Sequence, residues 1–111
     1  MPFIIMDEIE KETVTPKYST AYGELVTGEQ IEVGRLRFEK GFGAVEHRHP
    51  HEQIIYIIEG KLEVHLDGET AIMGPGQGFH APPNVPHNVI ALEDTVVISS
   101  KGIVGGVGHK I

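Results

Sequence analysis

Short apolar runs, separated by glycine, proline and charged residues, follow one another along the whole chain. Most runs are rich in Val, Ile and aromatic residues, and several alternate apolar with polar positions, as Leu62, Val64 and Leu66 do with the residues between them. Alternation with a period of two is typical of a strand that buries one face. The pattern therefore predicts strands over residues 3–6, 21–26, 31–38, 54–59, 61–67, 70–73, 87–92 and 95–99.

Turn signals between these runs favour an all-β fold. Glu59-Gly60 and Asp67-Gly68-Glu69 are typical of tight hairpin turns. Many short strands, spaced by about 8–12 residues, indicate an all-β sandwich or barrel. Helix-favouring composition is confined to residues 6–13, where we expect no more than a single helical turn.

The chain of 111 residues has the size of one domain, and no repeat or linker divides it, so residues 1–111 are expected to form one domain. Its last ten residues, 102–111, contain four glycines and form either a flexible tail or a strand that approaches another segment closely. The apolar run at 3–6 would be an unpaired edge strand in a monomer. Strand exchange or sheet extension with a second copy would pair it, which predicts a homodimer.

Charge and composition exclude several functions. Nine basic and sixteen acidic residues give a formal charge of −7, which argues against a nucleic-acid partner and against attraction to an anionic membrane. The chain has no cysteine, so neither disulfides nor thiolate ligands contribute. The N-terminus lacks the basic region of a signal peptide, and no stretch approaches the roughly 20 apolar residues that span a bilayer. We expect a cytoplasmic protein.

A histidine cluster carries the strongest functional signal. His47, His49, His51 and Gln53 share one parity of an extended chain, and a further imidazole, His87, follows in a Pro-rich stretch. Three neutral imidazoles and an amide oxygen, brought together by folding, would hold one divalent transition metal ion. Ni, Mn, Fe and Zn are the candidates, because imidazole-rich sites accept all of them.

The residues around this cluster resemble the first motif of the cupins, with Gln where the usual pattern has Glu, at Gly41, His47, His49, Gln53 and Gly60. The second motif is matched more loosely by Gly76, Pro82 and His87, with Asn84 where the pattern has Gly and Ala91 where it has Asn. The resemblance covers about residues 31–98. It implies a cupin double-stranded β-helix, a jelly-roll-like barrel, with one metal ion near its open end held by His47, His49, Gln53 and His87.

Within the cupins, the segment HRHPHEQ and the apolar strand after it are similar to the small pectin-degradation proteins of the KdgF type. This similarity implies linearisation of 4,5-unsaturated uronates. It also implies an acid, an aromatic and an Arg facing the substrate from the final strand and C-terminus. Here no Asp, Glu, Arg, Phe, Tyr or Trp follows Asp94. Binding of a uronate carboxylate would then fall to Lys101, His109, Lys110, Arg37 or Arg48.

Three functions follow as hypotheses. An amide in place of a carboxylate at Gln53 would leave the metal a better Lewis acid, and four protein ligands would leave two positions open for a hydroxy-carbonyl or hydroxy-carboxylate group. The first hypothesis is therefore non-redox chemistry on a small sugar acid or hydroxy-carbonyl compound. His51 and His80 are the candidate catalytic residues for it. The second hypothesis is an Fe(II)-dependent dioxygenase with the same ligands, and the third is a non-catalytic cupin that binds a sugar or another small molecule. Glu52 lies on the opposite parity from Gln53 and is expected to point outward. Tyr56 has the same parity as Glu52, which argues against a catalytic hydroxyl, and we expect it to be part of the core or of a pocket wall.

Overall fold

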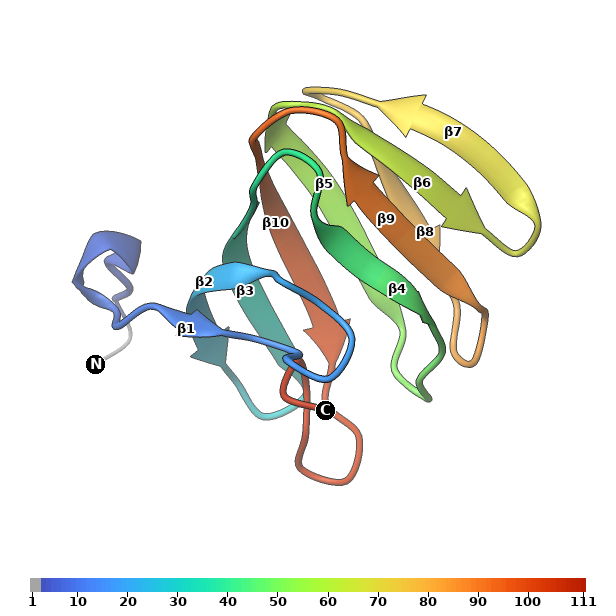
Figure 1. Cartoon of the computed structure of the whole chain (residues 1–111). Coiled ribbons are helices and arrows are strands. Elements are labelled where there is room, and N and C mark those ends of the chain that lie inside the picture. The colour runs from blue at the N-terminus through green and yellow to red at the C-terminus, as the bar shows by residue number, and fades with distance from the viewer. Residues whose placement is uncertain (1–2) are drawn as a thin grey trace.

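The computed structural model describes residues 3–111, and these residues form almost only strands (Figure 1). A single turn of 3-10 helix, η1 (Met6–Glu8), lies where the composition favours a helical turn. The strands that follow it are β1 (Glu12–Thr13), β2 (Tyr22–Thr27), β3 (Ile31–Phe38), β4 (Gly43–His47), β5 (Gln53–Glu59), β6 (Leu62–Leu66), β7 (Glu69–Met73), β8 (Gly78–Ala81), β9 (His87–Ala91) and β10 (Thr95–Gly102).

The strands form two antiparallel sheets that pack face to face as a barrel, as the turn spacing predicts. The larger sheet has the order β1-β2-β3-β10-β5-β8, and the smaller sheet has the order β4-β9-β6-β7. The last strand, β10, lies between β3 and β5, so the C-terminal part of the chain occupies the middle of the larger sheet. Figure 1 shows the strands of both sheets running obliquely, with the C-terminus beside the lower end of β10.

Alternating burial along the strands builds the core between the sheets. On β5 the side chains of Ile55 and Ile57 are buried and that of Tyr56 is exposed, so the parity is confirmed and the placement of Tyr56 in the core or a pocket wall is wrong. On β6 Leu62 and Val64 are buried on one face. The apolar core combines residues of both sheets: Val14, Ala21, Leu36, Phe38, Ile55, Ile57, Leu62, Val64, Val89, Ala91 and Val97.

Two local predictions are wrong. The run at residues 3–6 forms no strand, because a strand needs a partner edge and this segment leads away from the barrel before η1 begins (Figure 1). Glu59-Gly60 is a corner and no hairpin, since β5 and β6 belong to different sheets. The turn at Asp67-Gly68 does join a hairpin, β6 to β7, with positive φ at both residues as a type I′ turn requires.

The inward side chains of β10 include two polar groups near its C-terminal end. Thr95 and Val97 are buried in the first half of the strand, and Ser99 and Lys101 are buried where the strand approaches its C-terminal end. The same end of the barrel receives the first residues of β5 and β9 and the last residue of β4. The fold therefore gathers polar side chains from four strands at one end of the interior.

A left-handed residue in the loop before β9 helps to shape this polar end. Asn84 has φ of 63°, a conformation that Asn tolerates better than most residues other than Gly. Its backbone N–H donates to the carbonyl of His49 over 2.7 Å. Asn84 therefore adopts the backbone conformation that a glycine would provide, and it connects the loop before His87 to the loop that carries His49.

Candidate metal centre

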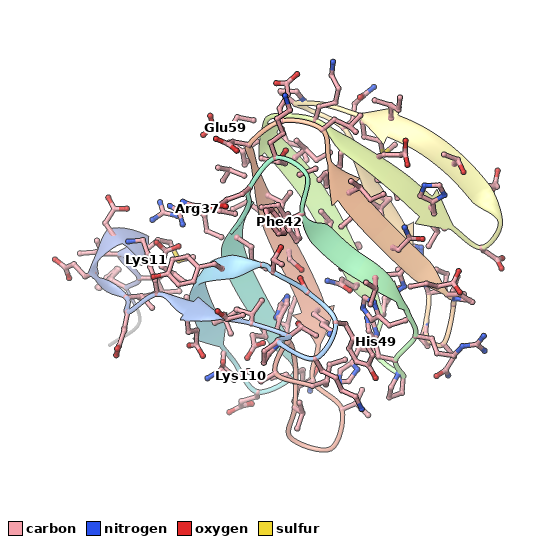
Figure 2. All side chains as sticks on the ribbon, viewed as in Figure 1. Lys11, Arg37, Phe42, His49, Glu59 and Lys110 are labelled. Carbon is pink, nitrogen blue, oxygen red and sulfur yellow. The ribbon has the colours of Figure 1, made fainter. Side chains whose placement is uncertain are left out.

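The ends of three strands bring the histidine cluster together. His47 is the last residue of β4 and His87 the first residue of β9, and the two are partners in the register of the smaller sheet. Gln53 is the first residue of β5 in the larger sheet, and His49 lies in the connection that crosses between the sheets. Figure 2 shows His49 beside the end of β4, at the opposite end of the barrel from Glu59.

His47, His49 and His87 form a compact group. Their ligand nitrogens all lie within 4.8 Å of one another. Metal–nitrogen bonds of about 2.0–2.1 Å place two ligands of one ion roughly 3–4 Å apart, so this group has the scale of a metal site. His49 and His87 are buried and His47 is half-buried, so the group lies at the mouth of the barrel.

Backbone carbonyls orient all three imidazoles in the same way. The Nδ1–H groups of His47, His49 and His87 donate to the carbonyls of Val45, His51 and Val85, over 2.7, 3.0 and 2.8 Å. Each acceptor is only two residues away in the chain. The Nε2 atom of each ring is therefore left with its lone pair free, which is the arrangement that metal-binding histidines show.

The fourth group, Gln53, adds an oxygen to the same place. Its Nε2–H donates to Ser99 Oγ over 2.9 Å, so its Oε1 is turned toward His49 Nε2, 3.1 Å away. The lone pairs of these two atoms face each other, since His49 donates through Nδ1. Two acceptors at this distance are stabilised by a cation between them. The residues present thus fit one divalent transition metal ion, as the sequence predicts.

Burial keeps the imidazoles neutral. Removal from water lowers the pKa of His47, His49 and His87, and the charge of Lys101 acts in the same direction. The pKa of His49 falls to about 4. A metal can bind only deprotonated imidazole, so these rings are ready to bind at neutral pH without losing a proton.

A small cavity continues from the cluster into the barrel. It has a volume of about 40 Å³, and the polar residues of its wall include His47, Gln53, His87, Lys101 and His109. Lys101 is only 2% exposed, and burial lowers its pKa to about 8, with the charge of Glu32 acting against this shift. Its ammonium group is therefore mostly charged at pH 7, inside the barrel and next to the histidines.

The two predicted catalytic residues, His51 and His80, lie in different places. His51 is buried beside His49, with 5.3 Å between the ring centroids, and its Nε2–H donates to the carbonyl of Val107 over 2.7 Å. His80 is exposed on the outer face of β8 and pairs with the outward-pointing Glu52 over 2.6 Å. The structure therefore brings His51 to the cluster and leaves His80 outside the barrel, because residues of β8 alternate and Phe79 and Ala81 take the inner positions.

The residues predicted to bind a substrate carboxylate also divide into some that are buried at the polar end and some that are not. Lys101 and His109 are buried at the polar end, whereas Arg48 is exposed, Lys110 pairs with Glu12 and Arg37 pairs with Glu24. Of the two alternatives for the Gly-rich end, the structure shows the close approach, since it returns to the barrel and buries His109.

Two buried residues of this end, Glu32 and Ser99, are missed by sequence reasoning. The sequence contains a signal for both: Glu32 shares the parity of Leu36 and Phe38 on β3, and Ser99 shares the parity of Val97 on β10. A polar residue at a core position of a strand indicates a buried contact.

The barrel with a histidine cluster at one end defines a class of protein. Residues 34–99, more than half of the chain, match the model of the cupin domain. The chain belongs to the cupin family, which confirms the predicted fold.

Within this family the chain is similar to KdgF proteins. It is 36% identical over 64 residues, 57% of this chain and 58% of the other, to the pectin degradation protein KdgF of Dickeya dadantii (strain 3937). The solved structure of KdgF from Halomonas sp. has a TM-score of 0.80 and 30% identity, and the match covers 92% of this chain and 93% of that chain.

A third similar protein is a dioxygenase by name. Quercetin 2,3-dioxygenase of Bacillus subtilis (strain 168) is 32% identical over 85 residues, 75% of this chain and 25% of that protein. The chain thus spans less than two thirds of the length of the curated relatives it matches. Among residues 3–111, no helix is long and apolar enough to cross a membrane.

Proposed function

We propose that this protein is a metal-dependent enzyme that acts on a small sugar acid or hydroxy-carbonyl compound by non-redox chemistry, with linearisation of unsaturated uronates as the leading reaction. The observation that carries this proposal is the charge of the site. All four ligand groups are neutral, and the charged Lys101 lies beside them in a protein of net charge −7. A bound divalent ion therefore retains its full charge, and the site attracts an oxygen-rich anion.

The ion would supply Lewis acidity, polarising a carbonyl or stabilising a developing enolate or alkoxide without a redox change. The ammonium group of Lys101 would bind the substrate carboxylate at the inner wall of the cavity. It replaces the residues that the KdgF resemblance implies at the C-terminus. The similarity to KdgF of Dickeya dadantii, a pectin degradation protein by name, supports a uronate as the substrate.

His51 is the residue we assign as the proton acceptor. Its Nε2–H is committed to the carbonyl of Val107, so Nδ1 carries the free lone pair. This Nδ1 is buried and has no hydrogen-bond partner among residues 3–111. A buried basic nitrogen without a partner, next to a metal-ligand candidate, is suited to take a proton from a substrate or from a water molecule.

The experiment is an assay of the metal-stripped protein reloaded separately with Ni²⁺, Mn²⁺, Fe²⁺ and Zn²⁺. The substrate is the unsaturated galacturonate monosaccharide, and the readout is loss of its enol-ether absorbance. We expect activity with at least one metal, none in the stripped protein, and loss of most activity in His51→Gln, with His80→Gln as the matched control that retains it. Tight binding of the uronate without any product by NMR would instead favour the non-catalytic cupin.

An Fe(II)-dependent dioxygenase is the second candidate, favoured by the three-histidine group and by the similarity to quercetin 2,3-dioxygenase. The same assay without oxygen distinguishes the two. Full turnover under anaerobic conditions excludes the dioxygenase, whereas oxygen uptake that depends on substrate and Fe²⁺ establishes it.

We also propose a homodimer. Phe3, Ile4 and Ile5 are exposed on the N-terminal arm, and Ile54 and Ile58 are exposed on the outer face of β5. Burial of both surfaces in an exchanged arrangement would remove this apolar area from water. Sedimentation velocity at micromolar concentration should show a dimer that Ile5→Ser weakens; a monomeric wild-type protein contradicts it.

A further inference from the structure

A chain of buried hydrogen bonds connects Gln53 to the Gly-rich C-terminal segment. The amide nitrogen of Gln53 contacts Ser99 Oγ at 2.9 Å, and Ser99 Oγ contacts His109 Nε2 at 2.8 Å. The other ring nitrogen, His109 Nδ1, lies 2.6 Å from Glu32 Oε1. Four side chains from three strands and the tail thus form one continuous buried line that ends at the metal centre.

The donors and acceptors of this line have only one consistent direction. Glu32 accepts from Thr27 Oγ1–H and from the backbone N–H of His109, each over 2.6 Å. Burial raises the pKa of Glu32, but these hydrogen bonds outweigh it, so the pKa lies below its ordinary value and the group is a carboxylate. His109 must then donate to it through Nδ1–H. Burial also lowers the pKa of His109 to about 4, which leaves its Nε2 as an acceptor.

The same donor-to-acceptor direction extends through Ser99 to Gln53, the proposed fourth ligand. Because His109 Nε2 accepts, the Ser99 hydroxyl donates to it and can accept only from Gln53 Nε2–H. The amide oxygen of Gln53 is then the atom that faces His49. In the opposite orientation the amide would present N–H groups to the cluster, and an N–H group cannot bind a cation.

The tail is shaped to hold this imidazole. After β10, Val104 and Val107 exchange two backbone hydrogen bonds across Gly105 and Gly106, both of positive φ, and the chain turns back to the barrel. At Gly108 a Cβ atom would lie 2.6 Å from Glu32 Oε1, so only glycine allows this approach. Thr15 Oγ1–H donates to the carbonyl of His109 over 2.7 Å.

The geometry points to a role for the tail in the metal centre: His109 is a positioning residue that, through Ser99, fixes Gln53 with its oxygen toward the metal. Residues 103–111 thereby determine metal affinity. This inference depends on metal binding at the three-histidine cluster, which the proposed function also requires, but it is independent of which reaction follows.

Two substitutions of His109 separate this role from simple packing. In His109→Asn, the shorter amide can still donate to Glu32, but nothing reaches Ser99. In His109→Gln, the amide oxygen extends as far as Nε2 and can accept from Ser99. Ser99→Ala breaks the line at its middle. His65→Asn, on the outer face of β6, is the control, because His65 contacts only Glu63 and Thr70 in the hydrogen-bond network of residues 3–111.

The measurement is metal affinity of the full chain by competition with a chelating dye, together with thermal unfolding of the metal-free proteins. We expect His109→Asn and Ser99→Ala to weaken binding about 10- to 100-fold, the usual cost of losing an outer partner of a ligand. His109→Gln should recover most of this loss, and His65→Asn should bind as the wild type does.

Three results overturn the inference. The first is unchanged affinity in folded His109→Asn, and the second is an equal loss in folded His109→Gln. The third is read from ¹⁵N NMR of the wild type, which should show His109 protonated at Nδ1 alone; protonation at Nε2 contradicts the direction of the line even where a variant does not fold. A wild-type protein that binds no metal would refute the metal centre itself, and the proposed function with it.

Discussion

The four groups proposed as metal ligands are held in two different ways. Each imidazole donates to a carbonyl two residues away, so the orientation of its ring is set within its own segment, although the pairing of β4 with β9 brings His47 and His87 together. The amide of Gln53 is oriented by Ser99, 46 residues away, and through it by His109 and Glu32, which are themselves 77 residues apart in the chain. The histidine rings are therefore oriented locally once the sheets have brought them together, whereas the orientation of the amide also requires β3, β10 and the tail.

This difference has a chemical reason. An imidazole that donates through Nδ1 has one free nitrogen and cannot point the wrong atom at a metal. A neutral amide has two ends of nearly equal size and opposite character, so its orientation must be set by its surroundings. As a fourth ligand, the neutral amide would leave a bound metal more positive than a carboxylate would, and this gain would depend on a network that selects the oxygen.

Removal of a locally held ligand has the largest expected effect. His49→Ala deletes one of the three imidazoles and the partner of Gln53 Oε1, and it should lower metal affinity by more than about 100-fold, beyond the loss of an outer partner. Metal analysis of the purified protein checks this. His80→Ala, on the outer face, should retain the metal content of the wild type. A full complement of metal in His49→Ala would contradict the centre.

The difference between nearby and distant partners also decides which residues of the site could be predicted from the sequence. The three histidines and Gln53 could be predicted to meet in the fold because their spacing lies within two short segments, and the structure does bring them together. Glu32 and Ser99 act only through the pairing of β10 with β3 and β5, which places Lys101 beside both Glu32 and Gln53, and no short segment contains this register. The strands β4 and β8 are also missed, since GAVEH and GFHA contain few β-branched residues and are stabilised by their neighbours in the sheets.

Replacement of Lys101 removes the buried positive charge that lies beside both the histidines and Gln53. The folded-state pKa of about 8 is lower than the ordinary 10.5, so the charged form is less stable in the fold than in the unfolded chain. Lys101→Met should therefore raise the free energy of unfolding of the metal-free protein at pH 7, by on the order of 2–3 kcal/mol. This gain should shrink as pH rises through 8 and vanish above about 10.5, where both states are neutral.

The same variant should bind uronate more weakly, because the carboxylate loses its ammonium partner. Denaturant unfolding at pH 7 and pH 11 measures the first effect, and a uronate titration of the metal-loaded protein measures the second. Lys40→Met is the matched control, since Lys40 is exposed. A gain in stability that is equal at both pH values would show that packing, and not the buried charge, is responsible.

Displacement of the tail should affect only the remotely held ligand. In Gly108→Ala the new Cβ would meet Glu32 Oε1, so the tail must shift and His109 must move away from Ser99. We expect a loss of about 1–3 kcal/mol in stability and a loss of metal affinity no larger than that of His109→Asn. Denaturant unfolding and dye competition measure the two. Gly74→Ala is the control, because its nearest neighbour would be an ordinary 3.7 Å away.

The prediction with the smallest expected effect tests most directly whether the amide, unlike the imidazoles, needs distant residues to orient it. In Gln53→Glu the fourth ligand becomes a carboxylate, whose two oxygens are equivalent acceptors, so no orientation has to be selected. His109→Asn should then cost less metal affinity in the Gln53→Glu background than in the wild type. We expect a coupling of about 1 kcal/mol between the two positions, within the range found for residues of one hydrogen-bond network. Dye competition on the four proteins of the cycle measures it. Equal losses in both backgrounds would mean that His109 supports the barrel end without orienting the amide, because only an unsymmetrical ligand needs a directed partner.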